Sequence, residues 1–397
     1  MGKALLLAST ISASVSGNTV TVAGSLGTSV NAPATRSNYT ARIAGTYSKL
    51  AVLADAIGTG RTVTFRKNGA DATQTVAPTD TTAGLYEDTT HSDSIAAGDI
   101  VNMRPVSTGT PTYYWYRQVF SATSNHACIY FCATQNTNVG ASTTNYFPIC
   151  GNRQGSALTV EANAQCLIRA GGTFGNLQIN VTANSRSDAT TVKSRKNGAD
   201  GNQSISIGAG LTGVFEDTSN TDTVTSGDLL AISFVTGGGT GTLSLLGAVG
   251  GSIINTTSNS NDIFATRTTG ATRAASGTPD YYFIAGDIVT PGSEALAKVQ
   301  HGFAVKMSGM RLYVSANTYA ATATVVLRVN GADTPLTFTI GAGATGWFED
   351  TTHAVAVGAD NDVCISIVGG TSGSLTMRTL GLTEREQLPR VQAFLAG

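Results

Sequence analysis

Apolar and polar residues alternate over short stretches along most of the chain. Residues 204–207 read Ser-Ile-Ser-Ile and residues 336–340 read Leu-Thr-Phe-Thr-Ile, which places apolar side chains on one face and polar side chains on the other. Val, Ile, Thr and aromatic residues dominate such stretches, and Gly, Asn, Asp and Ser separate them. This pattern predicts an all-β protein built from antiparallel strands with one buried face.

The middle third of the chain shows the predicted strands most clearly. Short segments there combine β-branched or aromatic residues with polar borders, which is typical of a β-sandwich or barrel. We expect strands at residues 127–133, 146–150, 164–170, 177–183, 190–195, 203–207, 214–216, 229–235 and 242–246.

One unit of about 130 residues occurs three times along the chain. In each copy a strand leads into an Asn-Gly pair, and such a pair favours a tight hairpin because both central residues of a type I′ turn need positive φ. The predicted turn residues are Asn68, Gly69, Asn197, Gly198, Asn330 and Gly331.

A Glu-Asp-Thr motif follows each Asn-Gly pair. Its glutamates, Glu87, Glu216 and Glu349, lie 19 positions after the asparagine in every copy. Because this constant spacing leaves little room for a different topology, we expect the three units to share one fold. We place three tandem antiparallel β-sandwich domains at residues 1–122, 123–255 and 256–382, followed by a C-terminal attachment tail at 383–397.

A Gly-Asp pair at residues 98–99 and 227–228 precedes a late strand in the first two copies, and the third copy has Asp-Asn-Asp at 360–362. Together with the Asn-Gly turns, this order resembles the jelly-roll domains of the complement C1q and tumour-necrosis-factor type. The tandem units, with strands rich in Gly, Ala, Thr, Ser and Asn, look like virion proteins of tailed bacteriophages of the head-decoration, fibre or tail-accessory kind. The resemblance implies jelly-roll-like sandwiches and a structural role on a particle.

The paired carboxylates of the Glu-Asp-Thr motif are the strongest candidates for chemistry. Adjacent residues of a strand point to opposite faces, so the two carboxylates of one motif do not form an acid/base pair. A calcium ion would need six to eight oxygen ligands, drawn partly from other loops. We expect the Asp and Thr side chains to bond turn backbone instead. We also expect His91 and His353, which follow the motif in two copies, to be surface residues.

No catalytic or cofactor motif appears in the sequence. The histidines lack a nearby Gly-x-Ser-x-Gly motif, and His-Glu-x-x-His is absent. Glycine runs such as 237–239 follow a strand without opening a helix, so they are not phosphate-binding loops. Five cysteines, four of them between residues 128 and 166, include no Cys-x-x-Cys pair. We expect no enzyme activity, cofactor or metal, and mostly buried free thiols, with one disulfide among the middle cysteines as the alternative.

Composition narrows the class of partner. Only 12% of the residues are charged, against a usual ~25%, and the net charge is −1. Without a basic cluster the chain lacks the phosphate-neutralising force that nucleic-acid binding needs. No apolar run approaches a membrane span of about 20 residues, and the first apolar run is too short for a secretion signal, so we interpret it as a strand. We expect a protein made in the host cytoplasm without a signal peptide.

Two segments depart from the repeat and are candidate interfaces. The first is an aromatic strand in the first copy, where two of the four rings must point away from the local core and form either a protein interface or a sugar-stacking platform. The second is the tail, whose apolar residues recur at near-helical spacing around Pro389. The candidate interface residues are Tyr113, Tyr114, Trp115, Tyr116, Leu388, Val391, Phe394 and Leu395.

The sequence therefore favours a non-enzymatic structural component of a phage virion, located on the particle surface as a capsid decoration, cement or fibre-like protein. Its expected partners are other capsid or tail proteins, and the three units predict a pseudo-threefold block or a homo-oligomer. The alternative is a carbohydrate-binding adhesin or receptor-binding tail protein that holds a host-surface glycan. A tail-associated glycosidase lacks a carboxylate pair that could be placed.

Overall fold

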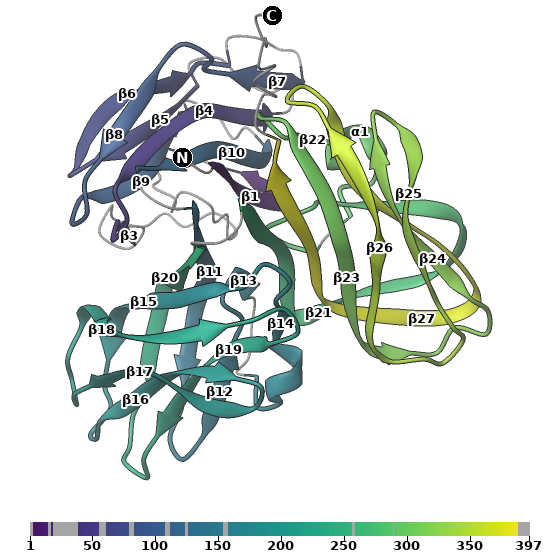
Figure 1. Ribbon diagram of the computed structural model, residues 1–397. Helices are drawn as coiled ribbons and strands as arrows, with labels where there is room; N and C mark the ends of the chain where they lie inside the picture. Colours follow the sequence, from purple (N-terminus) through teal and green to yellow (C-terminus); the bar gives the residue numbers. More distant parts are fainter. Residues whose placement is uncertain are drawn as a thin grey trace, which may run out of the picture.

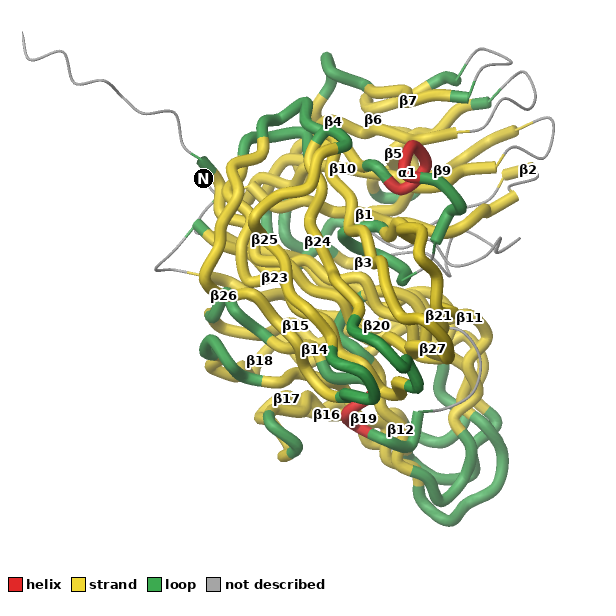
Figure 2. The backbone as a smooth tube through the Cα atoms, turned by 90° about the vertical axis from the view of Figure 1, so that its right-hand side faces the viewer, coloured by secondary structure: helices red, strands yellow, loops and turns green. Residues whose placement is uncertain are grey.

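The computed structural model describes residues 3–14, 17–18, 39–54, 61–78, 83–107, 112–123, 126–153, 158–255, 259–288 and 290–387. Nearly all of the regular structure in these ranges is β-strand; the helices are the 3-10 turn η2 (Glu161–Asn163) and α1 (Glu294–Ala297), red in Figure 2. The chain forms three tandem antiparallel β-sandwiches of jelly-roll type, as the sequence predicts (Figure 1).

The first domain packs two sheets face to face. One sheet has the order β1-β10-β4-β7, with β8 also on β4, and the other has the order β2-β9-β5-β6, with β3 on β9. The first strand thus lies beside the last, as in a jelly roll. The strands are β1 (Lys3–Ser14), β2 (Gly17–Asn18), β3 (Tyr39–Thr40), β4 (Gly45–Ala54), β5 (Thr62–Lys67), β6 (Ala70–Val76), β7 (Gly84–Glu87), β8 (Ser92–Ile95), β9 (Ile100–Ser107) and β10 (Thr112–Ala122).

The middle domain repeats this order, with β18-β15-β20-β11 in one sheet and β12-β19-β16-β17 in the other. Each of the nine predicted strands overlaps a strand of the structure, and β13 was not predicted. The strands are β11 (His126–Val139), β12 (Thr144–Phe147), β13 (Gly151–Arg153), β14 (Cys166–Leu167), β15 (Gly172–Asn184), β16 (Thr190–Lys196), β17 (Ala199–Ile207), β18 (Gly213–Val224), β19 (Leu229–Thr236) and β20 (Leu243–Asn255).

The third domain uses two very long strands that bend from one sheet into the other. Residues 363–369 of β27 pair with β24, whereas residues 375–386 pair with β23. One strand thereby serves as both the penultimate and the last strand of the jelly roll. The strands are β21 (Ser260–Tyr282), β22 (Val299–Gln300), β23 (Val305–Asn317), β24 (Ala323–Val329), β25 (Ala332–Ile340), β26 (Gly346–Val357) and β27 (Asp362–Glu386).

The end of β27 corrects the predicted domain boundary at residue 382. Residues 383–386, assigned to the tail from their charges, continue the strand and pair with β21 and β23. Polar residues are tolerated there because pairing in a sheet uses backbone groups. The predicted tail residues Leu388, Val391, Phe394 and Leu395 lie outside the described residues.

The predicted Asn-Gly turns connect β5 to β6, β16 to β17 and β24 to β25. Both residues of each pair have positive φ, for example 53° at Asn197 and 80° at Gly198. The asparagine Oδ1 accepts the backbone N–H of the residue 32 positions later, which is Ile100, Leu229 or Asp362. Ile100, Leu229 and Asp362 are therefore equivalent residues, and they are the reference points for comparing the domains.

Strand β13 joins the second and third domains at the backbone level. It pairs in parallel with β11 of its own domain and, through Asn152 and Arg267, with β21 of the next domain. A single sheet therefore runs from β18 through to β26. The first domain keeps its own sheets, and its β1 and β10 adjoin β11.

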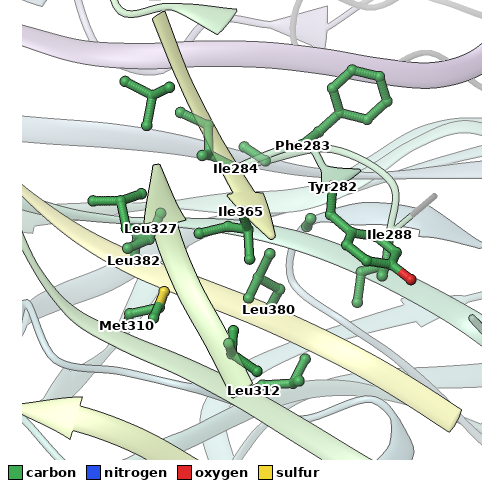
Figure 3. Close-up of a cluster of buried hydrophobic side chains, with 14 of the residues drawn as sticks. Tyr282, Phe283, Ile284, Ile288, Met310, Leu312, Leu327, Ile365, Leu380 and Leu382 are labelled. Carbon is green, nitrogen blue, oxygen red and sulfur yellow. The ribbon is translucent and has the colours of Figure 1, made fainter. Parts of the chain in front are cut away.

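Each sandwich has its own apolar core, and the core of the third domain extends into the first. Figure 3 shows part of it, including Leu312, Leu327 and Ile365. The same buried cluster includes Ala51, Trp115 and Val119 of the first domain. Apolar burial at about 25 cal/mol per Å² therefore holds domains together as well as sheets.

Candidate functional site: the contacts between the three domains

The aspartate of each Glu-Asp-Thr motif is bound within its own domain. Asp88 accepts backbone N–H groups from Thr75 at 3.0 Å, Thr90 at 3.1 Å and His91 at 3.0 Å. The equivalent aspartates are bound in the same way by Ser204, Ser219 and Asn220 and by Thr337, Thr352 and His353. These carboxylates hold a turn against the neighbouring strand, which is the architectural role that the motif predicts.

A side chain with a hydrogen-bond donor at position 91, and at its equivalents in the other copies, also binds the motif aspartate. His91 Nδ1 lies 3.0 Å from Asp88, His353 Nδ1 lies 2.8 Å from Asp350, and Asn220 Nδ2 donates to Asp217 at 3.0 Å. Burial by itself raises the pKa of Asp88, but these backbone and side-chain hydrogen bonds lower it to about 2. The aspartates are therefore ionised acceptors.

The glutamates of the second and third motifs face the opposite way, toward the preceding domain. Arg42 Nε donates to Glu216 at 3.2 Å, so the first domain reaches the motif of the second. Arg169 Nε donates to Glu349 at 2.9 Å, so the second domain reaches the motif of the third. Thr40 pairs with Ile100 and Leu167 pairs with the equivalent residue Leu229, so Thr40 and Leu167 hold the same position in their domains. Arg42 and Arg169 each lie two positions later and are therefore equivalent as well.

A backbone carbonyl completes each of these two contacts. The side chain of Gln178 donates to the carbonyl oxygen of Thr40 at 3.4 Å and accepts the Thr40 N–H at 3.2 Å. Arg311 occupies the same position of the third domain and donates to the carbonyl oxygen of Leu167. Gln178 and Arg311 pair directly opposite the motif glutamates in the sheet. Every residue has a backbone carbonyl, so the acceptor does not depend on which side chain the accepting residue carries. The donor, in contrast, differs between the two contacts.

The contact between the second and third domains is also the most buried. Asp262 accepts the backbone N–H of Arg169 at 2.7 Å and of Ala170 at 2.8 Å, and its Oδ1 lies 2.8 Å from an Arg311 Nη2. Asp262 and Arg311 are both fully buried. A buried ion pair tolerates loss of either partner poorly, because the remaining charge stays without compensation.

The third contact, between the third and first domains, follows the same plan with different residues. The position equivalent to Arg42 and Arg169 is Gly302, and the position equivalent to Gln178 is Ala51. Arg117, which pairs with Ala51 on the adjacent strand, takes over both roles. Its Nη1 donates to the carbonyl oxygen of Gln300 at 2.8 Å, and its Nη2 binds Glu87.

The predicted aromatic interface strand divides between two cores. Tyr113 and Tyr116 lie in the core of the first domain, whereas Tyr114 and Trp115 pack against the third domain. Trp115 Nε1 donates to the carbonyl oxygen of Lys298 at 3.0 Å. In the contact between the second and third domains, the Thr379 hydroxyl donates at 3.0 Å to the carbonyl oxygen of Gln165, the residue equivalent to Lys298. The aromatic strand is thus an interface inside the chain.

These contacts close a ring of three domains. The first domain binds the second, the second binds the third, and the third binds the first, each through the same two surfaces (Figure 1). Head-to-tail contacts of this kind form closed rings when the rotation between units closes. The six predicted turn residues, Asn68, Gly69, Asn197, Gly198, Asn330 and Gly331, lie in hairpins and make no interdomain hydrogen bond among the described contacts.

The sequence motifs did not reveal the arginines of the ring. Arg42 and Arg169 lie in similar short sequences, Arg-Ile-Ala-Gly and Arg-Ala-Gly-Gly, just before a long strand. That similarity was a usable signal, but the third copy has Gly-Phe-Ala there. Arg117 carried no signal, since it belongs to a different strand of the unit.

The described residues give two further observations. No group of three or more His, Cys, Asp or Glu side chains among them is arranged to hold a metal ion. Among the same residues no helix is long and apolar enough to cross a membrane.

Comparisons with known proteins add little to this geometry. No protein-family model matches the chain, and no curated protein matches it significantly. Among solved structures, a protein described by its triple jelly-roll fold and turret assembly in an archaeal virus is 14% identical over 88% of this chain and 81% of that chain, with a TM-score of 0.18. The insecticidal delta-endotoxin Cry8Ea1 from Bacillus thuringiensis is 8% identical, with a TM-score of 0.18; 62% of this chain aligns with 60% of the toxin. The jelly-roll assignment rests on strand order.

Proposed function

We propose that this chain is a non-enzymatic structural subunit of a virus particle that works as a pseudo-threefold block through protein–protein contacts. The observation that carries the proposal is the closed ring, in which three jelly rolls repeat one interdomain contact. Jelly rolls are a common architecture of viral capsid proteins. The blandly polar surface, with 12% charged residues in the chain, suits a particle exterior.

The repeated carboxylates support a structural function over an enzymatic one. Each motif aspartate binds turn backbone, and each motif glutamate binds an arginine of the ring. The motif that offered the best candidate chemistry is therefore occupied by contacts that build the fold. A tailed-phage decoration, cement or fibre protein is the specific form of this proposal.

The aromatic strand does not support the carbohydrate-binding alternative. A sugar-stacking platform needs aromatic faces open to solvent, and Trp115 is only 1% exposed because it packs against the third domain.

The test is to look for the chain in particles. Virions purified from cells that carry the gene are analysed by mass spectrometry and by cryo-electron microscopy, and we expect peptides of this chain together with a three-lobed density of its size on the particle. The test variant is Trp115→Ala, which opens the contact between the third and first domains. Its control is Thr144→Ser, a mild change at the start of β12. The proposal fails if the purified virions contain neither peptides nor density.

A further inference from the structure

The three Asn-Gly turns differ in one side-chain contact. The side-chain nitrogen Nδ2 of Asn68 donates to Asp99 Oδ1 at 2.7 Å, and Nδ2 of Asn197 donates to Asp228 Oδ1 at 2.7 Å. Among the described contacts Nδ2 of Asn330 donates no hydrogen bond, although its Oδ1 accepts a backbone N–H as in the other copies. The side chain of Asn330 is therefore held at one end, whereas the other two are held at both ends.

The residue at position 361 is the cause of this difference. Asn361 is equivalent to Asp99 and Asp228, since each of the three accepts the backbone N–H of the residue three positions earlier, at 2.6, 2.7 and 2.8 Å respectively. An aspartate has a second oxygen that accepts from the turn asparagine, but the second polar atom of the Asn361 side chain is a donor, Nδ2. The change from Gly-Asp to Asp-Asn-Asp in the third copy thus removes the acceptor for Asn330.

We propose that Asn330 is a site of spontaneous deamidation and that it reacts in preference to Asn68 and Asn197. Asparagine before glycine is prone to this reaction because glycine has no side chain to shield its backbone nitrogen. All three asparagines are exposed and are followed by Gly-Ala-Asp, so neither exposure nor the residues that follow distinguish them. The bond to Asp99 or Asp228 does distinguish them, because a hydrogen bond to a charged acceptor is stronger than one between neutral groups.

The reaction starts when the side chain turns so that Cγ of Asn330 reaches the backbone nitrogen of Gly331. This nitrogen attacks Cγ and forms a new N–Cγ bond, the Cγ–Nδ2 bond breaks, and the side-chain nitrogen leaves as ammonia with the proton of the Gly331 nitrogen. Water then adds to one of the two carbonyl carbons of the succinimide ring and opens it. The product is aspartate when the N–Cγ bond breaks and isoaspartate when the original peptide bond breaks. No redox step occurs, and water is the co-reactant.

The hydrogen bonds of each turn set how often the side chain is free to react. Asn330 has to release one bond, to a backbone N–H, before Cγ can move. Asn197 has to release the equivalent bond and also the bond to Asp228, which makes its open state about 10-fold rarer or more. The modification therefore falls on one of three otherwise equivalent turns.

The experiment uses the purified full-length chain and needs no particle, so its result is separate from that of the proposed function. The protein is incubated in mildly alkaline buffer, and peptide mapping by mass spectrometry measures the fraction of amide converted to carboxyl at each turn over time. We expect Asn330 to convert at least about 10-fold faster than Asn68 and Asn197. In concentrated urea, which removes the contacts of the turns, the three sites should convert at similar rates.

Two reciprocal variants test the cause. Asn361→Asp gives Asn330 an acceptor and should slow its conversion about 10-fold or more, to the rate of the other two turns. Asp228→Asn copies the residue of the third domain and should speed conversion at Asn197 alone; if it unfolds the middle domain, Asn361→Asp decides by itself. The proposal is overturned if the three sites convert at one rate in the folded chain, if the preference for Asn330 persists in urea, or if Asn361→Asp leaves the rate unchanged.

Discussion

The guanidinium of Arg117 fills the space beside Gly302. A Cβ atom on Gly302 would lie 3.3 Å from Cζ of Arg117 and 3.1 Å from Cγ2 of Val119. At the equivalent positions of the other domains, Arg42 and Arg169 extend from this place to the motif glutamate. The same space can thus hold an arginine at position 302 of the third domain or Arg117 of the first domain. In this protein Arg117 fills it and closes the ring.

Arg117→Ala should weaken the protein much more than Arg42→Ala. The Arg117 side chain is 1% exposed, and its loss leaves the Gln300 carbonyl and Glu87 without their donor, which costs about 3 kcal/mol or more. The Arg42 side chain is 30% exposed, and its ion pair is worth about 1 kcal/mol or less. Scanning calorimetry of both variants and the parent chain checks this. Equal losses of melting temperature would contradict the account of the ring closure.

Gly302→Ala should destabilise the protein more than Gly98→Ala. Both glycines have positive φ, 87° and 99°, so both substitutions bear similar backbone strain. A Cβ atom at Gly98 meets no atom within 4 Å, whereas at Gly302 it crowds Arg117 and Val119. The difference between the two melting temperatures therefore measures crowding at the contact between the third and first domains. Gly302→Arg, although it restores the residue type of the other copies, should be worse than Gly302→Ala.

Asp88→Asn should destabilise the protein at neutral pH and lose its effect in acid. The folded-state pKa of Asp88, about 2, lies below the ordinary value of 3.8, so the carboxylate contributes stability that is present above pH 4 and is lost as the pH falls through 2. An amide loses this contribution at every pH, at a cost of about 1–3 kcal/mol. Melting curves of both proteins between pH 7 and pH 2 should converge toward the acid end. A constant difference across that range would count against this role.

Gly198→Val should lower the stability of the middle domain. Gly198 has a φ of 80°, and a Cβ atom there would meet no other atom within 4 Å, so strain of the backbone is the whole effect. A β-branched residue with positive φ costs about 1–3 kcal/mol. Gly198→Asn is the control, because asparagine tolerates this region. If the two variants melt together, the turn does not need positive φ.

The sequence predicts the elements of this fold well and its interdomain contacts poorly, for a physical reason. Turn residues such as Asn197 and Gly198 act locally, because φ and the hydrogen bond to Leu229 depend on one hairpin and one neighbour. The partner of Glu216, in contrast, is Arg42, 174 positions earlier, and nothing local marks it. The acceptor carbonyls of the contacts, such as those of Thr40, Leu167 and Gln300, carry no side-chain signal at all.

The aromatic strand and the long strands show the same limit. The pattern at residues 113–116 predicts that some rings leave the local core, but it does not say which partner covers Trp115. In the third domain β21 and β27 run on through places where the middle domain has loops, since local composition does not distinguish a bend within a strand from a break.

Truncation separates the part of the predicted tail that belongs to the fold from the part proposed for attachment. Glu384 pairs with Met307, and its carboxylate lies 2.7 Å from Nε2 of the fully buried His301. Glu386 and Gln387 donate backbone N–H groups to Asn259 and Ala304. A chain that ends at Thr383 loses all of these bonds and should melt several degrees below one that ends at Gln387.

The chain that ends at Gln387 tests the attachment proposal itself. If residues 388–397 bind a neighbouring particle protein through Leu388, Val391, Phe394 and Leu395, this truncation should keep the melting temperature of the full chain, since it leaves every described strand intact, yet it should not be incorporated into particles. Quantifying the protein in purified virions by mass spectrometry measures incorporation. Full incorporation of the shorter chain would exclude the attachment role, and a large drop in its melting temperature would show that these residues support the third domain instead.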